Sequence, residues 1–205
     1  MSPLVEQIAS FGVSEGTLSL ILMLPVVASF IAFCRQIIGV RGFGIYITLI
    51  IAFAFVETSL KYGLVIFFVV VLAGTLARVL IKKVRVLYLP RMAIVLSGVT
   101  LAVFLMFLLG SYLNIEGLQF ISIFPILIMT LVAERFVAAQ IERGQKNAIL
   151  MTLEALILAI ISYFIINSIW LQEVLLNWPI CSLCVLFLFN LILGKWTGLR
   201  ITEYL

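Results

Sequence analysis

The sequence predicts an all-α polytopic membrane protein with seven transmembrane segments, and three observations support this fold class. The chain has 205 residues, of which 65% are hydrophobic, and its mean hydropathy is +1.33. These values exceed what a soluble domain of this size needs. Uncharged runs that approach or reach the length of a membrane span recur along the chain. Basic residues gather between alternate runs, as they do in cytoplasmic loops.

Residues 1–16 are expected to form a short lead outside the membrane. This lead contains Glu6 and Glu15 and no basic residue, whereas a cleavable signal peptide begins with positive charge. Residues 17–205 are expected to form one seven-transmembrane domain. The segments are expected, in chain order, at residues 17–34, 42–56, 62–77, 92–115, 119–143, 147–172 and 174–194.

Two of these segments are short, and we expect them to be broken. The second has fifteen uncharged residues, and in the fifth seventeen uncharged residues separate Glu116 from Glu134. A bilayer core of ~30 Å needs ~20 helical residues. Gly42 and Gly44 permit tight turns, and Pro125 removes a hydrogen bond from a helix. The sequence therefore predicts helix breaks at Gly42, Gly44 and Pro125, of the kind that line binding sites in transporters.

The distribution of positive charge predicts the orientation in the membrane. With seven segments, twelve of the thirteen basic residues fall on one side and only Lys61 falls on the other. The positive-inside rule then places the N-terminus outside and the C-terminus inside. The most basic stretch, residues 78–91, either retains its loop in the cytoplasm or holds an anionic lipid, a nucleotide or an acidic peptide.

An offset of 77 residues suggests an internal repeat. At this offset Phe43, Ile51 and Glu57 align with Phe120, Ile128 and Glu134, and Thr48 falls opposite Pro125. Each short segment also lies between two longer ones. Three segments in a unit would invert the second copy relative to the first. We therefore expect a 3+3 inverted repeat with short broken helices, followed by a seventh helix outside the repeat.

Several classes of site have no support in the residues. Histidine is absent, and the nine acidic residues are all glutamates, so neither a metal site nor a histidine proton shuttle is expected. Cys181 and Cys184 have C-x-x-C spacing, but they lie in an apolar run and are expected to be small buried helix residues. No nucleotide loop, nucleophile–base pair or basic patch with interleaved aromatics is seen. We expect no cofactor and no nucleic-acid partner.

The candidate polar site consists of Arg35, Arg41, Glu134, Arg135 and Glu154. A charge at the centre of a span costs ~2.5–3.5 kcal/mol. Glu154 lies seven residues into its expected segment, which is ~10 Å along a helix. Both glutamates lie toward the expected cytoplasmic side and are expected to approach Arg35 or Arg41. Two interpretations stay open: static salt bridges that hold the bundle, or a polar gate reached through the break in the fifth segment.

Five segments carry a resemblance to a known family. They are FCRQIIGVRGFG (33–44), LYLPRM (87–92), ISIFPIL (121–127), AERF (133–136) and KWTGLR (195–200). Together they resemble the bacterial seven-transmembrane domain that is usually fused to an inactive transglutaminase-like domain, from residue 18 onward. More distantly, the core looks like the small membrane subunit of poly-gamma-glutamate capsule synthesis and export. The chain departs from the family pattern in having Thr48 where a proline is usual and in lacking the soluble transglutaminase-like part.

The resemblance implies an integral membrane component of an anionic-peptide, polyglutamate-like synthesis, modification or export system. It also implies the bacterial inner membrane, a cytoplasmic ATP-grasp-type ligase, and a periplasmic transglutaminase- or peptidase-like protein as partners. Membrane lipids are expected around the chain, and a homo-oligomer is possible. The resemblance transfers no catalytic residue, so we expect no enzymatic activity. Two alternatives stay open: a structural anchor or scaffold that docks partners on both sides, and an independent secondary transporter.

Overall fold

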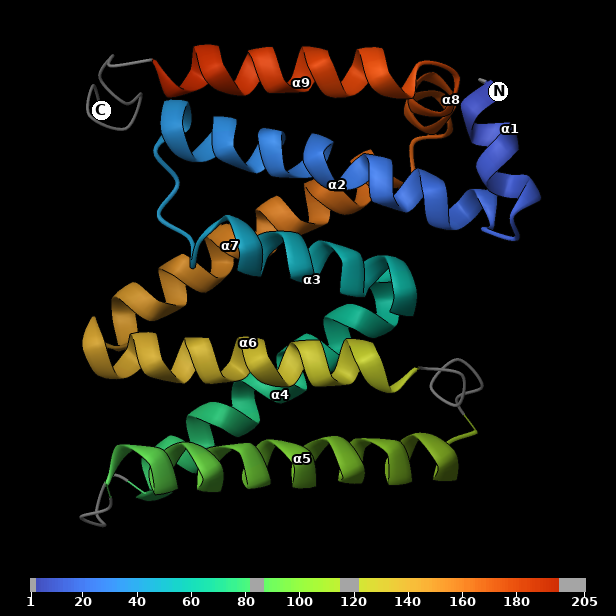
Figure 1. Ribbon diagram of the computed structural model, residues 1–205. Coiled ribbons are helices and arrows are strands. Elements are labelled where there is room, and N and C mark those ends of the chain that lie inside the picture. Colours follow the sequence, from blue (N-terminus) through green and yellow to red (C-terminus); the bar gives the residue numbers. More distant parts are fainter. Residues whose placement is uncertain (1–2, 82–86, 115–121, 196–205) are drawn as a thin grey trace.

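The computed structural model describes residues 3–81, 87–114 and 122–195, and these are almost entirely helical, with no strand among them. The all-α fold class is therefore as predicted. Figure 1 shows the order of the helices along the chain. They are α1 (Pro3–Ser10), α2 (Glu15–Phe33), the π-helical turn η1 (Cys34–Ile38), α3 (Ile45–Thr58), α4 (Leu60–Ile81), α5 (Tyr88–Tyr112), α6 (Ile123–Glu142), α7 (Gln145–Ile166), α8 (Ile169–Asn177) and α9 (Pro179–Gly194).

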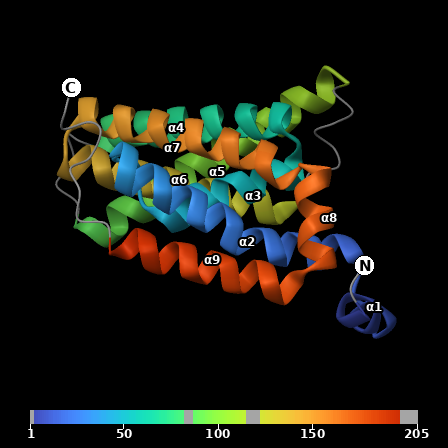
Figure 2. The same cartoon turned by 90° about the horizontal axis from the view of Figure 1, so that it is seen from above.

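Helix α3 lies at the centre of the bundle. It packs against α2, α4, α6 and α7, while α5 packs against α4 and α6, and α9 packs against α2. In Figure 1, α9, α2, α3, α6 and α5 lie in this order from top to bottom, and α4 and α7 run obliquely behind them. Figure 2 shows α4 and α7 together on the same side of the bundle. The helices α2, α4, α6 and α9 run in one direction, and α3, α5 and α7 run in the other.

The bundle is apolar both inside and outside, which fits a polytopic membrane protein. Ile51, Ala52 and Phe55 of α3 are completely buried in the core. Leucines on the outer faces of other helices are more than half exposed, such as Leu72 and Leu109. Among the described residues, five helices are long and apolar enough to cross a membrane. The number is six if the bent pair α8 and α9 is counted as one span. The apolar helix α3 is shorter, with 14 residues.

Glycine allows α3, α4, α5 and α6 to approach one another closely. A Cβ atom built at Gly63 in α4 would lie 2.5 Å from Cδ1 of Phe55 in α3. At Gly74 it would lie 3.2 Å from Val137 of α6, and at Gly98 of α5 it would lie 3.1 Å from Ala77 of α4. In a membrane, burial of apolar surface between helices stabilises little, because lipid is equally apolar. Small residues let the helices approach and stabilise the bundle through van der Waals contact instead.

The expected helix break at Pro125 is wrong. Helix α6 begins at Ile123, and its N-cap residue Ser122 accepts a hydrogen bond from the backbone N–H of Phe124. Pro125 therefore lies in the first turn, where backbone N–H groups have no partner within the helix and a missing one is tolerated. Helix α6 ends at Glu142, one residue from the expected end of this segment at residue 143. Its expected first residues, 119–121, lie outside the described residues.

The expected sixth and seventh segments have different boundaries in the structure. Helix α7 ends at Ile166 rather than near residue 172, and the short α8 then leads to α9 through a bend of 106°. Pro179 is the first residue of α9 and cannot continue the helix of α8, and a proline also restricts the residue before it, Trp178. Cys181 and Cys184 of α9 are free and exposed, not buried as expected.

Candidate functional site

Positive charge gathers at one end of the bundle. The C-terminal ends of η1, α4, α6 and α9 and the N-terminal ends of α5 and α7 lie together at the left of Figure 1. Four of the thirteen basic residues lie outside the described part of the chain, which leaves nine. Lys61, near the start of α4, lies toward the opposite end. The other eight belong to the segments that meet at the left of Figure 1, and we call this end of the bundle the basic end. They are Arg35, Arg41, Arg78, Arg91, Arg135, Arg143, Lys146 and Lys195.

The loop after η1 (residues 39–44) is shaped by a π-helical turn and by glycine. The backbone N–H of Gly39, which has a φ of +92°, donates to the carbonyl of Cys34 at 3.1 Å and ends the π turn. A guanidinium N–H of Arg35 donates to the carbonyl of Gly42 at 3.1 Å. Gly44 has a φ of +119° and serves as the N-cap of α3. Short π turns are frequent at functional sites, and this one positions Arg35 toward the loop.

Glu154 attaches this loop to α7. Its Oε2 accepts a hydrogen bond of 2.5 Å from the backbone N–H of Arg41. Gly42 is buried next to it, and a Cβ there would lie 3.5 Å from Cβ of Ala155. The structure thus places Glu154 against Arg41, but the contact is made by the backbone of Arg41 rather than by its guanidinium.

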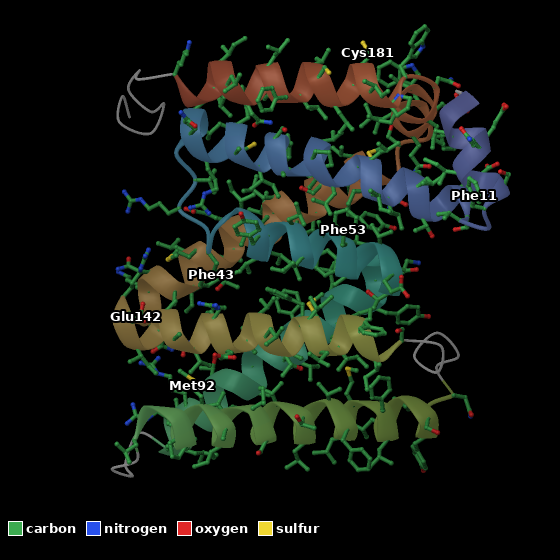
Figure 3. All side chains as sticks on the ribbon, in the orientation of Figure 1. Phe11, Phe43, Phe53, Met92, Glu142 and Cys181 are labelled. Carbon is green, nitrogen blue, oxygen red and sulfur yellow. The ribbon has the colours of Figure 1, made fainter. Side chains whose placement is uncertain are left out.

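Two adjoining cavities open at the basic end. The smaller, of about 280 Å³, is lined by four arginines and one carboxylate: Arg35, Arg41, Arg135, Arg143 and Glu142. The larger, of about 560 Å³, is lined by Arg41 and Arg143 as well, together with Asn147, Leu150 and Glu154. Figure 3 shows Glu142 and Phe43, which also lines the smaller cavity, at this end of the bundle. The two cavities carry four guanidinium groups and two carboxylates, and can therefore attract an anion.

Four of the five predicted site residues line these cavities, and Glu134 does not. Among the described residues, Glu134 makes no side-chain hydrogen bond and lines neither cavity. Its neighbour Arg135 does line the smaller cavity, because adjacent helix positions do not share a face. The structure therefore brings Arg135, and not Glu134, to the cavity that Arg35 and Arg41 line.

Sequence reasoning missed a second polar cluster, between α4 and α6. The guanidinium of Arg78 donates to the side-chain oxygen of Gln140 at 2.8 Å and to its backbone carbonyl at 3.0 Å. The amide nitrogen of Gln140, which is 1% exposed, donates to the hydroxyl of Thr75 at 3.2 Å. One hint of this cluster was present in the sequence: Gln140 is the polar residue in the otherwise apolar run 136–141. Glu142 and Arg143 were also missed, because residues at a helix end look like ordinary solvent-exposed charge.

Comparisons with known proteins identify one family. Its family model, described as seven transmembrane helices usually fused to an inactive transglutaminase, matches residues 7–205. No curated protein and no solved structure matches the chain. The match covers nearly the whole chain and agrees with the apolar helices described above, so the protein is a multi-pass membrane protein. The chain belongs to the family of seven transmembrane helices that is usually fused to an inactive transglutaminase.

Proposed function

We propose that the protein is the membrane component of a system that makes, modifies or exports an anionic, polyglutamate-like peptide. The observation that carries the proposal is the charge asymmetry, since eight of the nine described basic residues belong to one end of the bundle. A field of one sign attracts a polyanion and raises its local concentration. Arginine also binds carboxylates through two parallel hydrogen bonds. The basic end would therefore meet the anionic product first.

The basic end would face the cytoplasm of a bacterial inner membrane, with the N-terminus outside and the C-terminus inside. A cytoplasmic ATP-grasp-type ligase would supply the peptide on that side. A transglutaminase- or peptidase-like protein would act on the other side, which is supported by the usual fusion of the family to an inactive transglutaminase. The chain itself would contribute no catalytic residue.

We propose a 3+3 inverted repeat in which α2–α4 correspond to α5–α7, with α9 outside the repeat. The alternating helix directions support it, and so does the packing, because α4 contacts α5 and α6 as α7 contacts α2 and α3. Helices α4 and α7 both have 22 residues, and each buried position of α4 is buried again 85 residues later in α7. These pairs are Gly63 and Ala148, Ile66 and Met151, Phe67 and Thr152, Val70 and Ala155, Ala73 and Leu158, Gly74 and Ala159, Ala77 and Ser162, and Ile81 and Ile166.

Within this architecture we assign Arg35, Arg41, Arg135 and Glu154 to a polar site at the inner mouth of the bundle. Such a site sits where charged residues of membrane helices usually do, facing protein and water rather than lipid. The loop at residues 39–44 would act as its gate, with Glu154 holding the loop closed. The structural anchor is the second candidate, favoured by the hydrogen bond from the Arg41 backbone to Glu154, which fixes the loop to α7.

The test is purification of the tagged protein from its own bacterium in mild detergent, with partners and bound polymer identified by mass spectrometry. A ligase that forms amide bonds, together with a glutamate-rich peptide, is the expected result. A variant with glutamine at Arg35 and Arg135 should lose the peptide, whereas Lys61→Gln, at the opposite end, should keep it. Partners on both sides without any peptide would favour the structural anchor. Absence of both ligase and peptide would refute the proposal.

A further inference from the structure

We propose that the two adjoining cavities at the basic end bind the phosphate-bearing headgroup of an anionic membrane lipid. This inference does not rest on the proposed function. It starts from Arg135 and Arg143, which line the smaller cavity together with Arg35 and Arg41. Among the described residues, neither Arg135 nor Arg143 forms an ion pair with a carboxylate. Arg143 instead donates to the sulfur of Met151 at 3.5 Å. Their charge is therefore left for a ligand.

The carboxylates nearby offset only part of this positive charge. Glu154 already accepts the backbone N–H of Arg41, and Glu142 is the one carboxylate among the residues that line the smaller cavity. Four arginines and one glutamate thus line a space of about 280 Å³. Guanidinium is planar, always charged and weakly hydrated, and it binds phosphate oxygens through paired hydrogen bonds. Such a space and such donors suit a phosphate group.

The spacing of the arginines along α6 suits a ligand that lies at the border of the headgroup region. Arg135 lies seven residues before Glu142, the last residue of α6, which is ~10 Å along the helix axis. Arg143 follows directly after Glu142. From Arg143 to Arg135 the arginines span ~12 Å along the helix axis, so they reach through one polar layer of a bilayer, ~5–8 Å, to the edge of the hydrocarbon region. Basic pockets between transmembrane helices at the cytoplasmic side are typical sites for lipid headgroups.

The surface beside the larger cavity distinguishes a lipid from a soluble anion. Leu150 lines this cavity and is itself 55% exposed on α7. From Leu150 a stripe of exposed apolar side chains runs along α7 away from the basic end. Its further members are Leu153, Ile157, Ile161 and Phe164. A phosphate held by the arginines would place acyl chains along this stripe, whereas a soluble phosphate or an acidic peptide would gain nothing from it.

Native mass spectrometry of the purified full chain is the first test. Wild-type protein should retain an anionic phospholipid such as phosphatidylglycerol, and R135Q/R143Q should retain it at least about tenfold less, since each basic residue near a membrane surface contributes appreciably to anionic-lipid binding. K146Q is the matched control, because Lys146 belongs to the same end, is exposed, and lines neither cavity. Equal loss in K146Q, or full retention in R135Q/R143Q, would refute the site.

A second measurement uses only wild-type protein and does not depend on how the variants fold. Its thermal unfolding is followed in neutral detergent with added phosphatidylglycerol, with glycerol 3-phosphate, or with a glutamate decapeptide. Stabilisation by the lipid that exceeds stabilisation by the decapeptide, with none from glycerol 3-phosphate, is the expected result. Equal stabilisation by glycerol 3-phosphate would assign the cavities to a soluble phosphate, and stabilisation by the decapeptide but not by the lipid would assign them to an acidic peptide. Either outcome would overturn the proposal.

Discussion

The backbone N–H of Arg41 donates a hydrogen bond to the carboxylate of Glu154, a residue 113 positions further along the chain. This contact joins the loop at residues 39–44 to α7 beside both cavities. A hydrogen bond to a charged group contributes ~1.5–3 kcal/mol, and one between neutral groups ~0.5–1.5 kcal/mol. Glu154 therefore attaches the loop to α7, while the guanidinium of Arg35 attaches it to η1 through the carbonyl of Gly42.

Glu154→Gln and Glu154→Ala should separate the gate from the static anchor. Glutamine keeps an acceptor oxygen and should lose ~1 kcal/mol of stability, whereas alanine should lose ~2 kcal/mol. Thermal unfolding in detergent measures this loss, and Glu173→Gln, an exposed glutamate of α8, is the control. For a gate, Glu154→Gln should reduce peptide release or partner-coupled activity while the protein accumulates normally. Loss of activity only in step with loss of stability would favour the anchor.

Gly63→Ala should weaken the contact between α3 and α4. The new Cβ would lie 2.5 Å from Cδ1 of Phe55 and 2.7 Å from the hydroxyl oxygen of Thr58, so one of the two helices must shift. Overpacking of this kind costs ~1–3 kcal/mol, visible as a lower unfolding temperature and lower accumulation in the membrane. Gly16→Ala is the matched control, because nothing lies within 4 Å of a Cβ at that position. Equal behaviour of the two variants would mean that the close approach is not needed.

Gln140→Leu should be among the most damaging single changes in the bundle. It removes the side-chain acceptor of Arg78 and leaves the guanidinium half-buried between α4 and α6. The backbone carbonyl at position 140 still accepts from Arg78. The variant therefore loses one hydrogen bond to a charged group, which is worth ~1.5–3 kcal/mol. Gln140→Glu should be tolerated better, since it offers Arg78 a carboxylate. Thermal unfolding of both variants, with exposed Gln145→Leu as the control, checks this order.

The orientation can be tested with single cysteines in a variant that lacks Cys34, Cys181 and Cys184. A cysteine at Lys146, in the first turn of α7, should be labelled from the cytoplasm. A cysteine at Tyr112, which is 85% exposed at the end of α5, should be labelled from outside intact cells by a reagent that cannot cross the membrane. Labelling of both positions from the same side would contradict the seven-segment arrangement.

The positions of the helices could be predicted from the sequence much better than their ends. Hydropathy reports which stretches leave water, so the expected starts of α4, α5 and α7 lie within four residues of the observed ones. Helix ends depend on local backbone chemistry instead. Ser122 as an N-cap places Pro125 in a first turn, and Pro179 as a first residue produces the bend after α8. Neither effect changes the hydropathy of the segment.

The candidate site was predictable only as a set of charges. The proximity of the loop at residues 39–44 to Glu154 follows from orientation and depth along the helices. The atoms that meet do not, because a backbone N–H is present at almost every residue and leaves no mark in the sequence. The pair of Arg78 and Gln140 illustrates the same limit, since a long side chain can either extend toward water or turn inward to a partner on a neighbouring helix.

The attachment of α9 has a consequence for how the bundle opens. Two side-chain hydrogen bonds attach it to α2 and η1. The amide of Asn190 donates to the hydroxyl of Ser29 in α2 at 2.6 Å, and the amide of Gln36 in η1 donates to the carbonyl of Leu193 at 2.6 Å. Leu193 is the one buried residue of α9, and lipid chains can replace most of its other contacts without loss. Helix α9 should therefore detach as a unit about the Trp178–Pro179 junction, and its amides should exchange hydrogen before those of α3.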